Sequence, residues 1–212
     1  MKRFAPVPRP WGWQKHVLNC GRAWLKVAAN LSAERPRDLW SPYRDRLAAG
    51  FGELCGYTVM WTPNGTVDHH VPWVMVKGTA KADLAYQWSN LRYSDGWFNS
   101  ARGSTDVPDP YTVSDDWFEL LLPSLELVAT ASVPASEVDR VNAALRWLGK
   151  DGRVIKKRHA LWLAYRSLDP DGTPGMSFAQ IERWAPLIAR ALRNNAKFLH
   201  PADRARLLAG TL

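Results

Sequence analysis

The chain has 212 residues, of which 46% are hydrophobic and 23% are charged. This is the composition of a folded globular protein, and it excludes intrinsic disorder. No segment approaches the roughly 18 to 20 consecutive apolar residues of a membrane span, and no apolar stretch follows the basic N-terminus. We therefore expect a cytoplasmic protein without a membrane partner. The net charge of +8 favours a polyanionic partner, because phosphate binding releases condensed counterions.

The first half of the chain predicts helices followed by a small β-hairpin. An extended, proline-rich arm of about ten residues leads into a helix over about 15–31, and Ser41-Pro42 is a typical start for a second helix. Residues 56–61 are rich in β-branched and aromatic side chains, which favours a strand. Pro63-Asn64-Gly65 is a turn signal, and a second strand is expected over 66–70.

The segment after this hairpin is expected to be less regular. Residues 73–83 are predicted to form a loop that carries Lys77 and Lys81. A turn and a short helix are expected over 90–102, followed by a loop rich in Gly, Ser, Asp and Pro over 101–114.

The second half of the chain is predicted to be mainly helical from Ser114 onwards. The pair Ser177 and Gln180 has the spacing of a capping box. The expected helices cover about 135–148, 153–165, 177–194 and 201–208. Lys156-Lys157-Arg158-His159 is the densest basic cluster, and it fits either a solvated helix face or a phosphate-tracking patch.

The chain has twelve tryptophans. Most of them are expected to anchor the core, because each ring buries a large apolar area. One or two exposed rings could instead stack on unpaired bases, and the sequence does not say which.

Four polar side chains in the middle of the chain could cooperate in phosphodiester hydrolysis. Asp68 and Asn99 offer a carboxylate and a carboxamide oxygen, which are hard ligands suited to Mg²⁺. His69 can accept a proton from water near pH 7 as a neutral imidazole. A short hairpin packed on a helix could bring these groups and Asn90 into one small volume.

Three short blocks lie between Cys55 and Gly103: Val67-Asp68-His69-His70-Val71-Pro72, Asn90-Leu91-Arg92 and Asn99-Ser100-Ala101-Arg102-Gly103. In their order and spacing they resemble the signature of the HNH endonucleases, whose site is a ββα-metal finger. Each block alone would be a weak signal. The last position of the signature is Asn99 instead of histidine, which makes this the H-N-N variant.

The resemblance implies a role for each matching residue. His69 would be the general base, and Asn90 would hold the loop that carries it. Asp68 and Asn99 would bind Mg²⁺ or Mn²⁺, with Ni²⁺ and Zn²⁺ less favoured. Contacts with phosphate or DNA are predicted for four basic residues, namely Arg92, Arg102, Lys77 and Lys81. Each residue also has a structural interpretation: Asp68 and Asn90 as cap or turn residues, His69 bound to a backbone carbonyl, and Asn99 solvated. His70 is expected to point away from His69 if the strand continues through both.

The sequence departs from the family where many members hold a structural zinc. Two CxxC pairs would be needed, and only Cys55 is present, since Thr58, Asp95 and Phe98 stand at the other positions. We therefore expect no structural zinc. Cys55 and the distant Cys20 are predicted to be reduced, partly buried side chains.

The sequence as a whole predicts an α+β protein with a central ββα-metal finger inside a mainly helical domain. The expected regions are an N-terminal arm with helices over 1–52, the finger over 53–104, and a helical region over 105–212 that packs on the finger. The expected activity is nicking of double-stranded DNA by a monomer. The alternatives are an RNA-directed nuclease, or a non-catalytic subunit that binds DNA or docks a larger partner.

The flanking segments Arg35–Arg44 and Asp116–Val128 are loosely similar to small HNH proteins of bacterial anti-phage systems of the Septu and Zorya type. This similarity suggests a defence role and a larger defence-system partner. The sequence leaves open the oligomeric state and the specificity for a nucleic acid.

Overall fold

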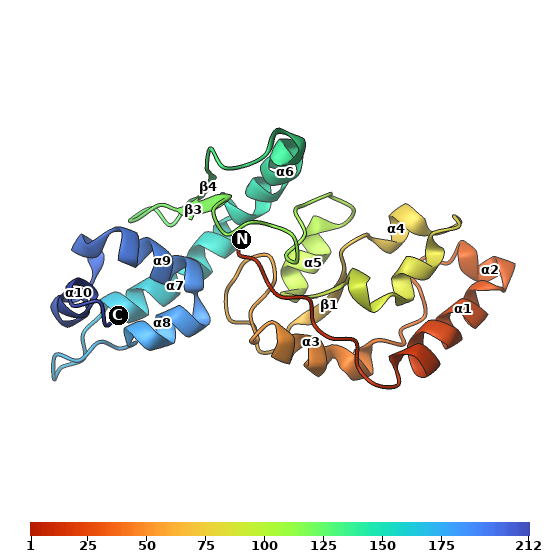
Figure 1. Cartoon of the computed structure of the whole chain (residues 1–212), viewed down its shortest axis with the longest axis horizontal. Coiled ribbons are helices and arrows are strands. Elements are labelled where there is room, and N and C mark those ends of the chain that lie inside the picture. Colours follow the sequence, from red (N-terminus) through yellow and green to blue (C-terminus); the bar gives the residue numbers. More distant parts are fainter. The chain divides into compact units, whose positions relative to one another are not determined.

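The computed structural model describes all 212 residues and divides into two compact units (Figure 1). The N-terminal unit comprises Arg3–Gly56 and Thr62–Thr112, and the C-terminal unit comprises Met1–Lys2, Tyr57–Trp61 and Val113–Leu212. Both units combine helices with a small two-stranded sheet, so the chain has a mixed helical and β structure. The regions 1–52 and 53–104, which were predicted separately, thus lie almost entirely within one unit. A helix with the length and apolarity needed to cross a membrane is absent.

The N-terminal unit contains several short helices instead of a few long ones. The predicted helix over 15–31 is interrupted at Val27, whose backbone is extended with φ −82° and ψ 114°. The helical segments are a π-helical turn at Gln14–Asn19, α1 at Cys20–Leu25, α2 at Ala28–Leu31, a 3₁₀ turn at Ser41–Tyr43, α3 at Arg44–Gly50, α4 at Trp73–Val76, 3₁₀ turns at Ala82–Tyr86 and Trp88–Asn90, and α5 at Gly96–Arg102.

The sheet of this unit pairs strands that are far apart in the sequence. β1 at Thr66–His69 runs antiparallel to β2 at Leu91–Ser94, with Asp68 opposite Arg92. The prediction that β1 pairs with residues 56–61 was wrong, because that segment forms no strand and most of it belongs to the C-terminal unit. The predicted turn over the start of 90–102 is strand β2. Asp95 then begins α5 by accepting a hydrogen bond from the Trp97 amide, so α5 directly follows β2.

Aromatic side chains attach the N-terminal arm to the core of this unit. The Trp13 ring is fully buried, 4.7 Å from the Trp88 ring, and its indole N–H donates to the Tyr86 carbonyl over 3.0 Å. The Trp88 indole in turn donates to the Val7 carbonyl over 2.7 Å. The arm is therefore packed on the unit, because buried indole N–H groups need a partner and backbone carbonyls of the arm and the core supply it.

The C-terminal unit is helical apart from a short hairpin. Its strands are β3 at Phe118–Leu120 and β4 at Leu127–Ala129, so the prediction of a helical start after Ser114 was wrong. The Ser177–Gln180 capping box is present, but Pro186 divides the predicted helix over 177–194 into two. The helices are a 3₁₀ turn at Ala135–Glu137, α6 at Val138–Leu148, α7 at Gly152–Arg166, α8 at Phe178–Trp184, α9 at Pro186–Asn194, a 3₁₀ turn at Ala196–Phe198, and α10 at Pro201–Leu208.

Candidate active site

Strand β1 directs Asp68 and His69 toward different neighbours. Successive side chains of a strand point to opposite faces. Asp68 contacts Arg102 of α5, whereas His69 lies against Trp40 and the carbonyl of Ala85. His70, just beyond β1, approaches Asp109 with its Nε2 atom at 3.9 Å, and it therefore has a different environment from His69.

His69 is held in one tautomer by the backbone. Its Nε2 atom lies 2.9 Å from the Ala85 carbonyl oxygen, which can only accept, so Nε2 carries a proton. In the neutral ring Nδ1 then keeps its lone pair. Burial lowers the pKa of His69 below its ordinary value, against the opposing effects of the Ala85 hydrogen bond and the Asp68 charge. The ring is therefore neutral at pH 7 and can accept a proton at Nδ1.

Trp40 fixes the orientation of the same imidazole from another side. Its ring packs edge-on against His69 with the centroids 4.5 Å apart. The Asp38 carboxylate accepts hydrogen bonds from the Trp40 and Ser41 amides and so orders this segment. Sequence reasoning did not identify Trp40 or Asp38 as neighbours of His69, because no local pattern relates them to β1.

Asp68 forms a buried ion pair. Its side chain is 4% exposed, and the Arg102 Nη2 atom lies 3.1 Å from Oδ1 and 3.0 Å from Oδ2. The same guanidinium donates to the carbonyls of His69, His70 and Thr105. Arg102 therefore connects α5 to the end of β1. Its side chain is 1% exposed, so it is not placed to contact a phosphate, contrary to the prediction.

Asn99 approaches β1 one turn of α5 before Arg102. Its Nδ2 atom donates to Thr66 Oγ1 and to the Val67 carbonyl, both over 3.2 Å. Because the carbonyl can only accept, these bonds fix the orientation of the carboxamide and direct Oδ1 elsewhere. Thr66 and Asp68 share one face of β1, so the Asn99 side chain lies on the Asp68 face.

Asn90 is a buried connector of backbone segments. Its Oδ1 accepts from the Val71 amide over 2.8 Å, and its Nδ2 donates to the carbonyls of Val71 and Leu84, both over 3.1 Å. Its own carbonyl accepts from the His70 amide. Three of these bonds hold His70 and Val71, directly after His69, and the fourth joins Asn90 to Leu84, the residue before Ala85. A contribution of this arrangement to catalysis stays a prediction.

Arg92 also lies inside the unit. It forms two hydrogen bonds with the Asp109 carboxylate, at 2.7 and 2.5 Å, and its guanidinium carbon lies 3.7 Å from the centre of the Tyr111 ring. Its side chain is 3% exposed. The prediction of a phosphate contact therefore does not fit this position. Arg92 holds the pKa of the Asp109 carboxyl below its ordinary value, even though burial opposes that shift.

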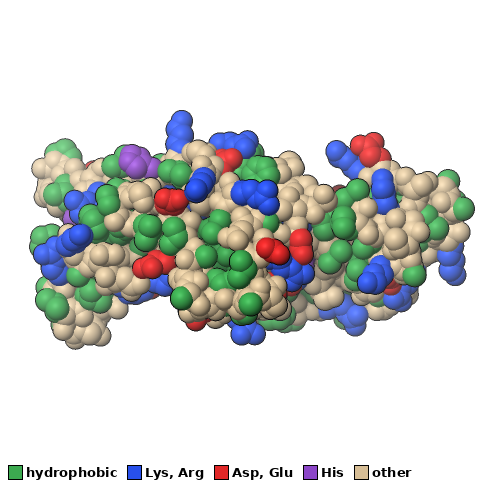
Figure 2. All heavy atoms as spheres, turned by 90° about the horizontal axis from the view of Figure 1, so that it is seen from above, with side chains coloured by type: hydrophobic (Ala, Val, Ile, Leu, Met, Phe, Trp, Pro, Cys, Tyr) green, Lys and Arg blue, Asp and Glu red, His purple; other side chains and the backbone are tan.

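The remaining basic residues divide between surface and interior. Lys81 is exposed and Lys77 is half-buried, so both remain available for the predicted contact with DNA. In the predicted basic cluster of α7, Arg158 is buried and donates to the Leu125 carbonyl, and burial lowers its pKa to about 10. On the face seen in Figure 2, Lys and Arg side chains are scattered among other side chains instead of forming one patch.

The donor set suits an ion that retains most of its water. No group of three or more His, Cys, Asp or Glu side chains is close enough to hold a metal. Asp68 and Asn99 nevertheless offer two oxygen ligands on one face of β1, and Mg²⁺ requires few protein ligands. Arg102 occupies part of the Asp68 carboxylate, but each carboxylate oxygen has a second lone pair. The residues therefore fit Mg²⁺ in ligand type, and the guanidinium competes for the same charge.

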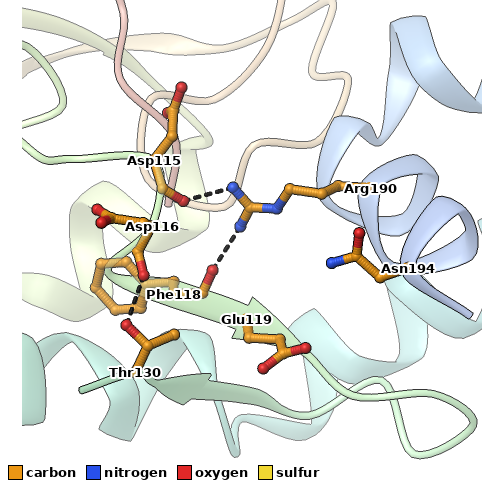
Figure 3. A pocket seen from close by; sticks show the side chains of 7 residues that line it. All are labelled: Asp115, Asp116, Phe118, Glu119, Thr130, Arg190 and Asn194. Atoms are coloured by element: carbon orange, nitrogen blue, oxygen red, sulfur yellow. Dashed lines mark hydrogen bonds between the residues drawn. The ribbon is translucent and has the colours of Figure 1, made fainter. Parts of the chain in front are cut away.

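A separate hollow of about 390 Å³ lies in the C-terminal unit and is lined by Asp115, Asp116, Phe118, Glu119, Thr130, Arg190 and Asn194 (Figure 3). The Arg190 guanidinium crosses this hollow and donates to the carbonyls of Asp115 and Phe118. None of the predicted site residues lies there. Because the Arg190 guanidinium is bound to backbone carbonyls, this hollow contains no group of side chains comparable to Asp68, His69 and Asn99 at β1.

Comparisons with known proteins give no independent assignment. No protein-family model, curated protein or solved structure matches the chain.

Proposed function

We propose that this chain is a metal-dependent endonuclease of the HNH type, which hydrolyses phosphodiester bonds of DNA with His69 as general base. The observation that carries the proposal is the state of His69: a neutral imidazole whose Nε2 proton is bound to the Ala85 carbonyl. An imidazole in this state has one basic nitrogen, Nδ1, as proton abstraction from water requires.

The surroundings of His69 support the proposal. Two antiparallel strands and a helix occur in the chain order β1, β2 and α5, as in a ββα-metal finger, with α4 and two 3₁₀ turns between the strands. Asp68 and Asn99 would hold Mg²⁺ or Mn²⁺, which when bound stabilises charge on the scissile phosphate and on the leaving 3′ oxygen. His69 would take the proton of the attacking water, while Asn90 orders the chain after it.

The opposite directions of Asp68 and His69 agree with this division of roles. In an in-line displacement the attacking and leaving oxygens lie on opposite sides of the phosphorus. His69 would then act on the attacking oxygen, and the ion held by Asp68 and Asn99 on the leaving oxygen. A single site of this kind cuts one strand, so a monomer is expected to nick duplex DNA.

Two observations favour a second candidate, a non-catalytic subunit that binds DNA or a partner: His69 binds a backbone carbonyl, as its structural interpretation expects, and Asp68 pairs with Arg102. Arg102 already neutralises Asp68, and both side chains are buried. A protein that retained this fold as a scaffold would gain stability from the ion pair without needing a metal. The wider suggestions of anti-phage defence, a larger partner protein and a cytoplasmic location rest on sequence alone, and they stay predictions.

Plasmid nicking by the wild type, His69→Ala and His70→Asn tests the proposal. We expect wild-type protein to relax supercoiled DNA with Mg²⁺ or Mn²⁺ and to be inactive in EDTA. His69→Ala should be slower by about 10²- to 10⁴-fold, the usual contribution of a general base. His70→Asn is the matched control, because its imidazole contacts Asp109 and not the proposed water.

Two outcomes would decide against the proposal. Equal nicking by wild type and His69→Ala would remove His69 from the chemistry. Wild-type protein that binds DNA but cuts neither DNA nor a labelled RNA with any of these metals would favour the non-catalytic candidate. Cleavage of RNA alone would retain the His69 chemistry and change the substrate.

A further inference from the structure

Trp11 is the one tryptophan whose side chain lies almost wholly in solvent. Its exposed fraction is 95%, whereas the other eleven tryptophans are buried or half-buried. Exposing such a large apolar ring is unfavourable in water. Single exposed hydrophobic side chains are nevertheless common, so the exposure needs a second observation before it indicates a ligand.

The backbone holds Trp11 outward on an ordered turn. The Trp13 amide donates to the Pro10 carbonyl over 3.2 Å, which closes a turn with Trp11 and Gly12 at its centre. Gly12 has φ +82°, a value that favours glycine at the third position of a type II turn. Trp13 anchors the turn through its buried ring and its bond to Tyr86. The Trp11 ring is thus presented on a fixed support.

Exposed basic residues flank this turn in the sequence. Five basic and no acidic residues occur from Arg3 to Ala33, and one of the five, Arg22, forms an ion pair with Asp83. Arg9 and Lys15 are exposed, and neither forms an ion pair; the one hydrogen bond of Arg9 is to Gln14, over 3.3 Å. A hollow of about 500 Å³ is lined by Arg9, Trp88 and Ser89, and also by the ion pair of Arg92 and Asp109. An exposed ring beside such cations is complementary to a flat, anionic ligand.

The turn is also connected to the candidate active site. Trp13 binds the carbonyl of Tyr86, and His69 binds the carbonyl of the preceding residue, Ala85. Trp13, which anchors the turn of Trp11, and His69, the proposed base, therefore bind neighbouring carbonyls of one 3₁₀ turn, Ala82–Tyr86.

We propose that Trp11 stacks on an unpaired base of a nucleic acid, while Arg9 and Lys15 contact the phosphates beside that base. Stacking needs a free base face, which an intact duplex does not offer along its length. The substrate class is accordingly nucleic acid with unpaired bases, such as a single strand, a gap or a frayed end. This inference rests on the proposed nuclease function and narrows its substrate from double-stranded DNA.

A lipid surface is the competing ligand, because tryptophan and cations also occur together at membrane interfaces. Membrane-bound segments present several apolar side chains together on one face. Around Trp11 the exposed neighbours include Arg9, Gln14 and Lys15, which are polar. The single ring therefore favours a nucleic acid.

Binding of a fluorescent single strand of about 16 nucleotides, measured by anisotropy, tests the proposal without cleavage. The full chain carrying His69→Ala is used in EDTA, with Trp11→Ala or Trp11→Phe added. We expect Trp11→Ala to weaken binding by about 10-fold or more and Trp11→Phe to retain most of the affinity. Leu208→Ala is the matched control, because Leu208 is also exposed, at 83%, and lies in the other unit.

The phosphate contacts have their own measurement. Adding Arg9→Gln and Lys15→Gln should make the negative slope of log affinity against log salt concentration less steep, by about 0.7 for each lost contact. Lys150→Gln is the control, as Lys150 is exposed and lies in the C-terminal unit.

Gly12→Ala tests the turn itself. It should weaken binding of the single strand although the Trp11 ring is intact, because the Gly12 backbone has φ +82° and an added Cβ would lie 3.1 Å from the His16 ring.

Three results would overturn the proposal. The first is no binding of the single strand, and the second is a Trp11→Ala variant that binds the strand as tightly as the His69→Ala background does. The third is a loss of affinity in Trp11→Ala that is equally large for a closed duplex. Binding to vesicles with anionic lipid that depends on Trp11, without binding to the single strand, would assign the turn to a membrane. Wild-type protein that binds the strand through Trp11 but cuts nothing would contradict the nuclease function and leave this inference standing.

Discussion

Both carboxylate oxygens of Asp68 lie within 3.1 Å of the Arg102 Nη2 atom, and each side chain is at most 4% exposed. This contact joins β1 to α5 at the residue that the sequence assigned to a metal. It therefore links the stability of the fold to the chemistry of the site.

Replacing Arg102 with methionine should destabilise the protein strongly. The variant would leave the Asp68 charge buried without its partner, which costs about 3 to 5 kcal/mol. Urea unfolding measures this loss. Arg46→Met is the control, because Arg46 is exposed and should change the free energy of unfolding by less than about 0.5 kcal/mol. Similar unfolding curves for the two variants would show that the ion pair contributes little.

Asn90→Ala should lower both stability and nicking. The substitution leaves the carbonyls of Val71 and Leu84 without the Asn90 donor, and the Val71 amide without its acceptor. Each buried group left unpaired costs about 1 to 3 kcal/mol. Asn64→Ala, at an exposed turn position, should leave both properties unchanged. Unaltered nicking by folded Asn90→Ala would separate Asn90 from the positioning of His69.

Acid should destabilise the folded protein through His69 and His70. Burial lowers the pKa of both imidazoles below the value of 6.5 expected in the unfolded chain. Between the folded pKa and 6.5 the unfolded state binds more protons, so stability rises with pH in this range and is lost as pH falls through it.

The midpoint of urea unfolding, measured from pH 7.5 down to pH 5, checks this dependence. His69→Gln and His70→Asn should each flatten the curve relative to the wild type. A wild-type curve that stays flat across 6.5 would contradict the assignment.

Asn99→Ala should weaken metal binding without unfolding the protein. The substitution removes one of the two proposed oxygen ligands, and it also removes the hydrogen bonds to Thr66 and Val67. Titration of Mn²⁺ into the apoprotein by calorimetry should show an affinity at least about 10-fold lower than that of the wild type. Asn19→Ala, at an exposed position in the π-helical turn, is the control. Equal Mn²⁺ affinities would place the metal elsewhere or exclude it.

The sequence by itself determined the local features of this protein. The Ser177–Gln180 capping box, the turn that precedes β1 and the short helix after Asp95 follow from backbone preferences of a few neighbouring residues. The alternation of side chains along a strand also predicted that His69 and His70 point in different directions. The resemblance to HNH endonucleases singled out Asp68, His69, Asn90 and Asn99 together, and their roles stay predictions.

Only the tertiary structure decided how these parts pair. The partner of β1 is β2, and the two strands are separated by a segment with a helix of its own, so no local preference specifies the pairing. Arg92 and Arg102 looked like surface cations, but each is neutralised inside the fold by an aspartate that is 17 and 34 residues away, respectively. A buried charge is stable only beside such a partner, and the chain brings that partner near by folding.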